Sequence, residues 1–306
     1  MNRIAEYIRY HADSSRALDI DPQVEAIAYL CGRFELNREQ RLWLCFLFST
    51  NYCVATTYFM YNEFPDFATV DEGRLQRWWD ANRGKLIFQT DRAWIRSRNQ
   101  FVDVFRSYRE QVKRWSNGSL SQSDALSAAM GGVADRFLAY DSLRRNFAIK
   151  LFGRFTWFLY SELLANIGGL AIGVRFDLAE AESSRNGLVF ALGAEDRAYT
   201  GHSGKRLPDN VMEWLNSGLT FIAGQVGQLP IHPRHKTLWS IETTLCAYKK
   251  HKLNGKRWVG YYIERMRREI VKLEALTSKE AGGGISWRPL WEFRRETYDS
   301  KYLKEL

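Results

Sequence analysis

The chain has 306 residues, 45% of them hydrophobic and 26% charged, and 44 lysines and arginines against 35 acidic residues leave a formal net charge of +9. This composition excludes a disordered chain, and the length allows a large hydrophobic core. Eleven tryptophans with only six prolines indicate long elements with few breaks, and we predict one globular unit.

The four cysteines are Cys31, Cys45, Cys53 and Cys246. They are spread along the chain without a C-x-x-C pair, which argues against a disulfide framework. The first sixteen residues are charged throughout and lack the apolar stretch of a secretory leader. We therefore expect reduced thiols and a cytoplasmic location.

Helical periodicity dominates the first half of the chain. Residues 1–36 form a predicted N-terminal helical segment, in which Ile4, Ile8 and Leu18 are apolar positions of the pattern. The next helix is predicted to begin after Asn37, because Asn37 and Gln40 have the spacing of a capping box. This helix opens a predicted helical core that extends over residues 37–276.

An uncharged run from Leu42 to Tyr61 follows. Its length is close to that of a membrane span, but Ser49, Thr50 and Asn51 place polar groups at its centre, where hydrocarbon would leave them unsatisfied. We therefore predict two buried helices that meet at Asn51, and no membrane contact.

Further helical patterns occupy 72–83, 90–115, 121–140 and 141–164, separated by short turns. The segment around 170–230 is the most irregular, and we predict a short irregular or β-containing insert there. Two more helical patterns lie between 235 and 276 and meet at Asn254-Gly255. An aromatic and basic tail, 277–306, is predicted to pack back on the core. The predicted fold class is mainly α.

Basic residues concentrate in the last of these helical pairs. Between His232 and Lys272 there are eleven lysines and arginines against three glutamates, which accounts for most of the surplus charge. The aromatic residues between them are Trp239, Tyr248, Trp258, Tyr261 and Tyr262. Such a region suits a polyanion whose phosphates contact cations and whose bases stack on rings. A solvated basic face over a hydrophobic core is the alternative interpretation.

Two partial motifs do not complete a known pattern. The segment Gly201 to Arg206 resembles a phosphate-binding P-loop, but Tyr199 stands where the first glycine belongs and no hydroxyl follows the Gly-Lys pair. His232, His235 and Cys246 lack a fourth ligand at suitable spacing for zinc. We therefore predict neither a P-loop kinase nor a metal centre.

Three groups of polar residues remain as site candidates. In the segment DRAWIRSR, Arg92 and Arg96 lie one helical turn apart and suit a phosphate, with Asp91 at the edge. A second group surrounds Arg144 and Arg145 in an aromatic-rich stretch and suits the DNA backbone. For both groups a solvent-exposed basic face is the alternative.

The third group begins at Lys236. In a helix Trp239, Glu242 and Cys246 share one stripe, so a carboxylate lies beside an aromatic ring and near cations. Glu242 is therefore an acid/base candidate. The alternative is a structural charge paired across helices with a residue such as Arg265.

Three stretches resemble a known family: the run WSIETTLCAYKKHKLNGKRWVGYYIERMRREI, the earlier FSTNYCVATTYFMYNEFPDF, and the D-R-x-W-I-R-x-R segment. They are similar to the amino acid:DNA transferases, also called α-glutamyl/putrescinyl-thymine pyrophosphorylases, which are helical bacteriophage enzymes that hypermodify thymine in DNA. The resemblance spans residues 38–276. It implies a fold related to helical DNA glycosylases and, for a phage-encoded protein, the host cytoplasm.

The implied substrate is duplex DNA that carries 5-hydroxymethyluracil activated with phosphate or pyrophosphate, and the implied reaction replaces that leaving group with an amino acid or amine. A kinase that phosphorylates 5-hydroxymethyluracil in DNA is the implied partner. No cofactor is assigned, and the sequence leaves open whether Mg²⁺ assists. This chemistry needs an anion site, a base for the incoming amine and, if the target base leaves the stack, an aromatic pocket.

From side-chain chemistry we assign residues to these roles as hypotheses. The catalytic candidates are Glu242, Lys236 and Asp91. The candidates for substrate and phosphate binding are Arg92, Arg96, Arg257, Arg265 and Asn51, and Lys236 is a further cation for pyrophosphate. Base stacking is assigned to Trp239 and Tyr262. The DNA-backbone candidates are Arg144, Arg145, Lys150, Arg154, Lys249 and Lys250.

Two other classes of function remain open. One is a noncatalytic DNA-binding or scaffold protein of a modification pathway. The other is a helical DNA glycosylase or lyase, in which Asp141 or Asp177 would face a flipped base. Burial of Asn51, Asp91 and Glu242 would favour an enzyme, because a plain DNA binder has no reason to desolvate acids beside its phosphate site.

Overall fold

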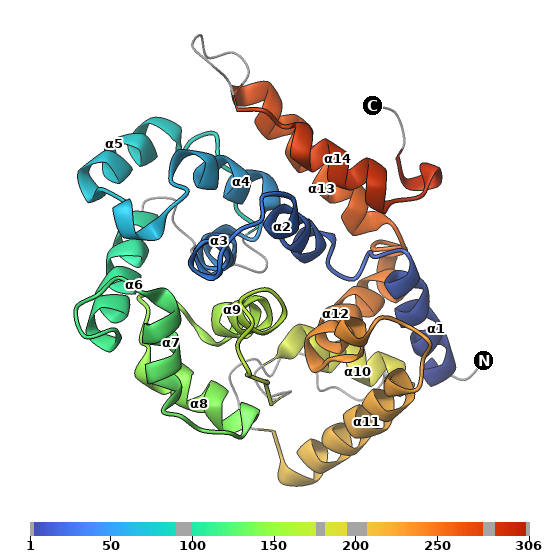
Figure 1. Cartoon of the computed structure of the whole chain (residues 1–306). Helices are drawn as coiled ribbons and strands as arrows, with labels where there is room; N and C mark the ends of the chain where they lie inside the picture. The colour runs from blue at the N-terminus through green and yellow to red at the C-terminus, as the bar shows by residue number, and fades with distance from the viewer. Residues whose placement is uncertain (1–2, 90–99, 176–180, 195–206, 278–284, 304–306) are drawn as a thin grey trace. The chain divides into compact units, whose positions relative to one another are not determined.

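A computed structural model describes residues 3–89, 100–175, 181–194, 207–277 and 285–303. In these ranges the chain forms fourteen α-helices and three short 3₁₀ helices, and no strand (Figure 1). The predicted mainly-α class is confirmed. None of the described helices is both long enough and apolar enough to cross a membrane.

Contacts group the chain into two compact units. Unit 1 comprises Met1–Pro22, Arg175–Arg265 and Tyr298–Leu306, and unit 2 comprises Gln23–Val174 and Met266–Thr297. The helices of unit 1 are α1 (Arg3–Arg16), α10 (Glu182–Ala191), α11 (Asp209–Gly227), η2 (Pro233–Lys236), α12 (Leu238–Asn254) and η3 (Ser300–Tyr302). Helix α13 (Tyr261–Thr277) begins in unit 1 and ends in unit 2.

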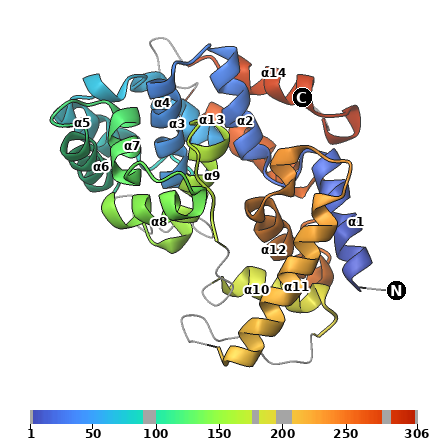
Figure 2. The same ribbon diagram turned by 60° about the horizontal axis from the view of Figure 1, so that its bottom comes forward.

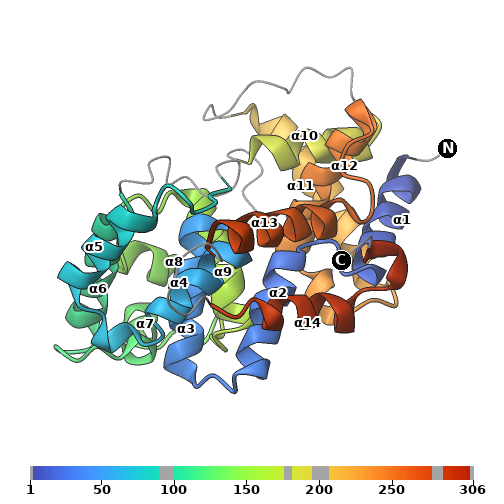
Figure 3. The same ribbon diagram turned by 90° about the horizontal axis from the view of Figure 1, so that it is seen from above.

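The remaining helices belong to unit 2. They are α2 (Pro22–Arg33), α3 (Arg38–Asn51), α4 (Val54–Glu63), η1 (Phe67–Thr69), α5 (Glu72–Asn82), α6 (Phe101–Trp115), α7 (Gln122–Met130), α8 (Arg136–Asn146), α9 (Arg154–Asn166) and α14 (Arg288–Thr297). Helix α3 lies beside α4, α7 and α9 (Figure 3). Every residue of α3 from Leu42 onward is buried.

Helix α3 begins where the sequence predicts. Asn37 Oδ1 accepts a hydrogen bond from the Gln40 main-chain N–H at 3.0 Å, and Gln40 Oε1 accepts one from the Asn37 N–H at 3.0 Å, so the capping box is confirmed. Aromatic side chains then fill the core, and the rings of Phe46 and Tyr108 stack with centroids 3.9 Å apart.

The predicted meeting of two buried helices at Asn51 is also confirmed. Helix α3 ends at Asn51, Tyr52 takes the left-handed conformation at φ 52°, and α4 begins at Val54. Asn51 Nδ2 donates to the Leu47 carbonyl at 2.7 Å, and Asn51 Oδ1 accepts from the Cys53 N–H at 2.8 Å. The side chain of Asn51 therefore satisfies main-chain groups that the helix break exposes.

The region predicted as an irregular or β-containing insert carries two helices, α10 and α11. Its described residues contain no strand, and irregular chain joins the helices. Gly201 to Arg206, the P-loop-like segment, lies outside the described residues. Glycines in this region explain the weak helical signal, because glycine has low helix propensity. At Gly218 a Cβ would lie 2.6 Å from Leu192 Cδ1, so the Leu192 side chain would have to move to admit one.

In unit 1, α10 packs closely on α12, and α1 lies against α10, α11 and α12 (Figure 2). A chain of buried polar groups joins α1 to α12 and η2. His11 Nε2 lies 2.9 Å from the His235 carbonyl, so Nε2 carries the proton and donates. His11 Nδ1 therefore accepts from Thr244 Oγ1 at 2.8 Å, and the Tyr7 hydroxyl donates to that oxygen at 2.8 Å.

Because of His11, the protein is expected to become less stable as the pH falls. Burial lowers the pKa of His11 from its usual 6.5 to about 4, and the charge of the adjacent His235 acts in the same direction. Between these values the unfolded chain binds the proton and the folded chain does not, so stability is lost as pH falls from 6.5 to about 4. The loss attributable to this group is at most ~3 kcal/mol.

Urea unfolding at pH 7 and pH 5 measures this loss. The variant His11→Gln should lose less stability between the two pH values than the wild type does, whereas His232→Gln, at an exposed histidine of the same unit, should behave like the wild type. An equal loss in His11→Gln and wild type would contradict the assignment.

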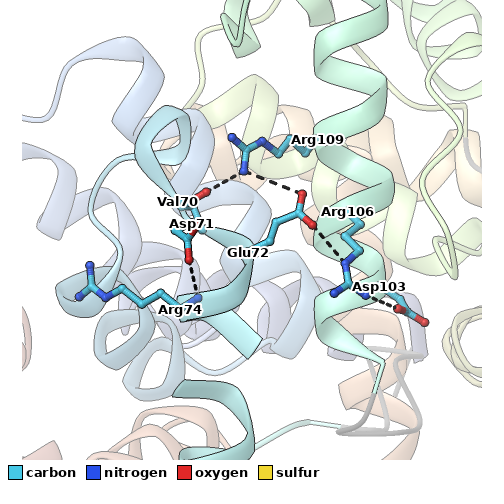
Figure 4. A network of polar contacts seen from close by, with 7 residues as sticks. All are labelled: Val70, Asp71, Glu72, Arg74, Asp103, Arg106 and Arg109. Carbon is cyan, nitrogen blue, oxygen red and sulfur yellow. Dashed lines mark hydrogen bonds and ion pairs between the residues drawn. The ribbon is translucent and has the colours of Figure 1, made fainter. Parts of the chain in front are cut away.

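A surface network joins α5 to α6 (Figure 4). Glu72 on α5 accepts from Arg106 Nε at 3.3 Å and lies 4.0 Å from Arg109 Nη1, while Arg109 Nη1 donates to the Val70 carbonyl at 2.6 Å. Arg106 also pairs with Asp103 at 3.3 Å. Exposed pairs of this kind contribute little individually, so the network orients two helices rather than supporting the core.

Candidate functional site

Helices α10 and α12 bring a buried carboxylate against a hydroxyl. Glu242 on α12 is 7% exposed, and its Oε1 accepts a short hydrogen bond from the Ser184 hydroxyl on α10. Ser184 has no exposed surface. Glu242 is therefore buried, as we expect of an enzyme rather than of a plain DNA binder, and the Ser184 hydroxyl fixes the orientation of its carboxylate.

A cluster of cations lies further along the same face of α12. Cys246 and Lys249 follow Glu242 at i+4 and i+7, which places all three on one stripe. Ser183 Oγ lies 3.0 Å from Cys246 Sγ, and Lys249 Nζ donates to Ser183 Oγ at 3.3 Å. Arg257 Nη1 donates to Cys246 Sγ at 3.4 Å. We call Ser183, Cys246, Lys249 and Arg257 the cation cluster.

The close approach of the two helices depends on Gly187. A Cβ at this position of α10 would lie 2.1 Å from the Leu245 carbonyl oxygen on α12. Only glycine therefore allows the backbones to come near enough for Ser183 and Ser184 to contact the side chains of α12. Thr237 caps the start of α12 and Gly255, at φ 64°, ends it.

The turn between α12 and α13 places Arg257 against an aromatic ring. Arg257 is 4% exposed, adopts the left-handed conformation at φ 58°, and has its guanidinium carbon 5.4 Å from the centre of the Tyr262 ring. Asp19 anchors the start of α13 by accepting from the Gly260 and Ile263 N–H groups at 2.6 and 2.8 Å. Burial raises the pKa of Asp19 to about 7, although these N–H groups act in the opposite direction.

This arrangement can hold an anion near a carboxylate. Lys249 and Arg257 supply two positive charges, and Ser183 supplies a hydroxyl beside them. No side chain caps helix α10 at Ala181. The first main-chain N–H groups of α10 point out of its N-terminal end, where Ser183 also lies, and such a helix end suits an anion. Phosphate oxygens suit these donors, and Glu242 lies one helical turn before Cys246.

Other predicted residues of unit 1 lie outside this cluster. Lys236 Nζ donates to the Gly227 carbonyl at 3.0 Å and thus caps the end of α11. Trp239 is 6% exposed and packs as a core residue. Arg265 and Lys250 are half-buried on α13 and α12. Among the candidates for stacking on a base, Tyr262 is the better placed, because it is half-buried beside Arg257.

The residues of unit 2 that were predicted to bind substrate or DNA range from fully buried to exposed. Asn51 has no exposed surface and bonds to the helix break. Arg144 and Arg145 on α8 are exposed, as a DNA contact requires. Lys150 Nζ lies 2.8 Å from Asp103 Oδ2, and this hydrogen bond lowers the pKa of Asp103. Arg154 is half-buried at the start of α9.

The segment that holds Asp91, Arg92 and Arg96 lies outside the described residues, as does Asp177. Their predicted roles stay predictions. In the part of the chain that the structure describes, no three His, Cys, Asp or Glu side chains come together as a metal site.

Sequence reasoning missed the serines of α10. Ser183 and Ser184 lie about sixty residues before their partners, in a segment without a clear pattern, so no local signal pairs them with α12. Trp258, one of the aromatic residues that the sequence places among the cations, is 52% exposed and packs edge-on against Tyr261 with centroids 5.4 Å apart. Such a ring is available to stack on a base.

Comparison with models of known protein families gives a match. The family model described as amino acid:DNA transferase matches residues 18–256, which include α10, α12 and every residue of the cation cluster except Arg257, the residue that follows the match. The match confirms the resemblance drawn from the sequence. No curated protein sequence matches the chain.

Proposed function

Because the chain belongs to the amino acid:DNA transferase family, we propose that it transfers an amino acid or amine onto 5-hydroxymethyluracil in DNA whose hydroxymethyl group carries a phosphate or pyrophosphate. The observation that carries the proposal is the position of Glu242. A buried carboxylate, oriented by Ser184, lies on the same stripe of α12 as two residues of the cation cluster.

The proposed reaction is a displacement at the methylene carbon attached to C5 of the base. The amine nitrogen forms a bond to this carbon as the carbon–oxygen bond breaks, and pyrophosphate leaves with the bonding electrons. Glu242 takes the extra proton from the nitrogen, and the Ser184 hydroxyl holds the carboxylate in place. Lys249 and Arg257 stabilise the negative charge that develops on the leaving group.

DNA binding is proposed for exposed cations and for two rings, of which one is exposed and one half-buried. Arg144 and Arg145 suit the phosphate backbone, and Tyr262 and Trp258 suit a base that has left the stack. The activated base has to be produced by a kinase that acts on 5-hydroxymethyluracil in DNA, which is the proposed partner. Mg²⁺ would associate with the pyrophosphate, and assays with and without a chelator test its contribution.

Pyrophosphate binding is expected to depend on Lys249. Loss of one charge-assisted contact in Lys249→Ala should raise the Kd for inorganic pyrophosphate ~10-fold or more, as measured by calorimetry. Lys301→Ala is the matched control, because Lys301 is an exposed lysine of unit 1 that pairs only with Asp299 among the ion pairs seen. Equal affinity for pyrophosphate in Lys249→Ala and the wild type would show that Lys249 is not part of the anion site.

The function itself is tested with DNA that contains 5-hydroxymethyluracil pyrophosphate. The protein is incubated with this DNA and a mixture of amino acids and amines, and the digested nucleosides are analysed by mass spectrometry. A new thymidine adduct supports the transferase. Unchanged nucleosides with intact, salt-sensitive DNA binding would favour a scaffold, and release of a free base would favour a glycosylase.

A further inference from the structure

The turn between α12 and α13 carries two exposed apolar side chains. Leu253, in the last turn of α12, is 61% exposed, the largest exposed fraction of any large hydrophobic side chain in the ranges that the structure describes. Trp258, five residues later, is 52% exposed. Single apolar residues on a surface are ordinary, but two within six residues give this turn an apolar surface that suits contact with another molecule. We call residues 253–258 the α12–α13 turn.

Hydrogen bonds hold the main chain of the α12–α13 turn. The Gly255 N–H donates to the His251 carbonyl at 3.0 Å, and Gly255 adopts the left-handed conformation that ends α12. Two residues later, the Arg257 carbonyl accepts from the buried Tyr10 hydroxyl on α1 at 2.7 Å. The exposed side chains therefore project from a main chain whose shape is set before a partner binds, which lowers the entropy lost on binding.

The same turn also reaches the cation cluster. Arg257 is buried and donates to Cys246 Sγ, whereas its neighbours Lys256 and Trp258 are exposed. Since a chain spans at most about 3.6 Å per residue, the Cα of Leu253 lies within about 15 Å of the Cα of Arg257. All of these residues belong to unit 1. A partner that contacts the α12–α13 turn therefore lies close to the proposed anion site.

The charges around the turn indicate which partner it suits. Residues 249–258 contain no acidic residue and five cations, which are Lys249, Lys250, Lys252, Lys256 and Arg257. Lys252 forms an ion pair with Glu6, and the segment as a whole stays positive. Such a segment suits the phosphates of a nucleic acid. Proteins that unstack a duplex combine cations of this kind with an apolar side chain, often leucine, that enters between two base pairs.

We propose that Leu253 inserts into the DNA duplex beside the target base and fills the space that this base leaves when it moves out of the stack. The neighbouring cations contact phosphates, and Trp258 remains exposed for the displaced base. The proposal rests on the proposed function for the identity of the target base. The insertion itself changes the stacking of the DNA and is measurable without any transfer.

The first test follows base stacking by the fluorescence of 2-aminopurine, placed next to 5-hydroxymethyluracil in a duplex. A saturating amount of the wild type should raise the fluorescence, because unstacked 2-aminopurine is brighter than stacked 2-aminopurine. Leu253→Ala should lose most of this rise, and Leu253→Met, which keeps an aliphatic side chain of similar volume, should retain it. Phe221→Ala is the matched control, because it removes a 52% exposed apolar side chain of α11 in the same unit.

The second test compares transfer onto the activated base in a duplex and in a single strand. Insertion is needed only where the base has to leave a paired stack. Leu253→Ala should therefore lower kcat/KM on the duplex ~10- to 100-fold, the factor that corresponds to burial of a leucine side chain, and should leave kcat/KM on the single strand nearly unchanged. Circular dichroism and melting curves show whether each variant is folded.

The outcomes separate this proposal from the proposed function. An equal loss of kcat/KM on both substrates, or the same fluorescence rise in folded Leu253→Ala as in the wild type, would overturn the insertion and leave the transferase intact. No rise with the wild type would also overturn it. A rise that depends on Leu253 without any transfer would support the insertion and contradict the function. Binding to vesicles of anionic lipid that depends on Leu253, with unchanged DNA fluorescence, would assign the turn to a membrane surface instead.

Discussion

Replacing Glu242 with glutamine is expected to lower kcat for transfer about 100- to 10,000-fold, the range typical of a lost general base. Glutamine has nearly the same shape and keeps an oxygen that can accept from Ser184, so the packing of α10 on α12 should survive. The lost property is the ability to take a proton. The KM for DNA should change little, because the cations proposed to bind phosphate are unchanged.

Steady-state transfer assays with activated DNA measure this effect, and Glu213→Gln provides the control. Glu213 is an exposed glutamate on α11 in the same unit, and its replacement should leave kcat unchanged. A Glu242→Gln protein with near wild-type kcat would show that another group accepts the proton. Retained melting behaviour in both variants is needed to exclude a folding defect.

The largest effect on stability is expected from Gly187→Ala. The added methyl group would lie 2.1 Å from the Leu245 carbonyl oxygen, and a backbone atom cannot move away as a flexible side chain can. Helices α10 and α12 would have to separate, at a cost of ~3 kcal/mol or more. The contacts of Ser183 and Ser184 with α12 would be lost at the same time.

Hydrogen exchange followed by mass spectrometry locates this effect, because peptides from α10 and α12 should lose protection first. Gly224→Ala is the matched control. Gly224 lies within α11, and a Cβ there meets nothing within 4 Å, so alanine should leave stability unchanged or raise it by ~0.5–1 kcal/mol. Equal stability of the two alanine variants would contradict the close packing of α10 on α12.

Local signals in the sequence predicted some helix boundaries and missed others, because the predicted patterns 121–140 and 141–164 divide inside α8 (Arg136–Asn146). The capping box at Asn37 and Gln40 and the helix end at Asn254-Gly255 depend on neighbouring residues, and the structure contains both. The polar residues around Asn51 likewise marked the break in the uncharged run. Each feature is set by side chains within a few residues, which a single sequence displays directly.

The pairing of distant residues could not be predicted in this way. Ser184 meets Glu242 across 58 positions, and Gln23 meets Glu269 across 246. Residue type also fails to show how a polar group is satisfied. Lys236 was assigned to pyrophosphate from its charge, yet its ammonium group bonds to the Gly227 carbonyl at the end of α11. Only the folded chain reveals such partners.

The most direct test of the account follows pyrophosphate and the modified nucleoside in the same reaction. DNA with 5-hydroxymethyluracil pyrophosphate is incubated with the wild-type protein and an amino acid, and both products are quantified over time. We expect a thymidine adduct and pyrophosphate to appear in equal amounts, and both to form much more slowly with Glu242→Gln. Release of pyrophosphate without an adduct, or no reaction despite intact DNA binding, would contradict this expectation.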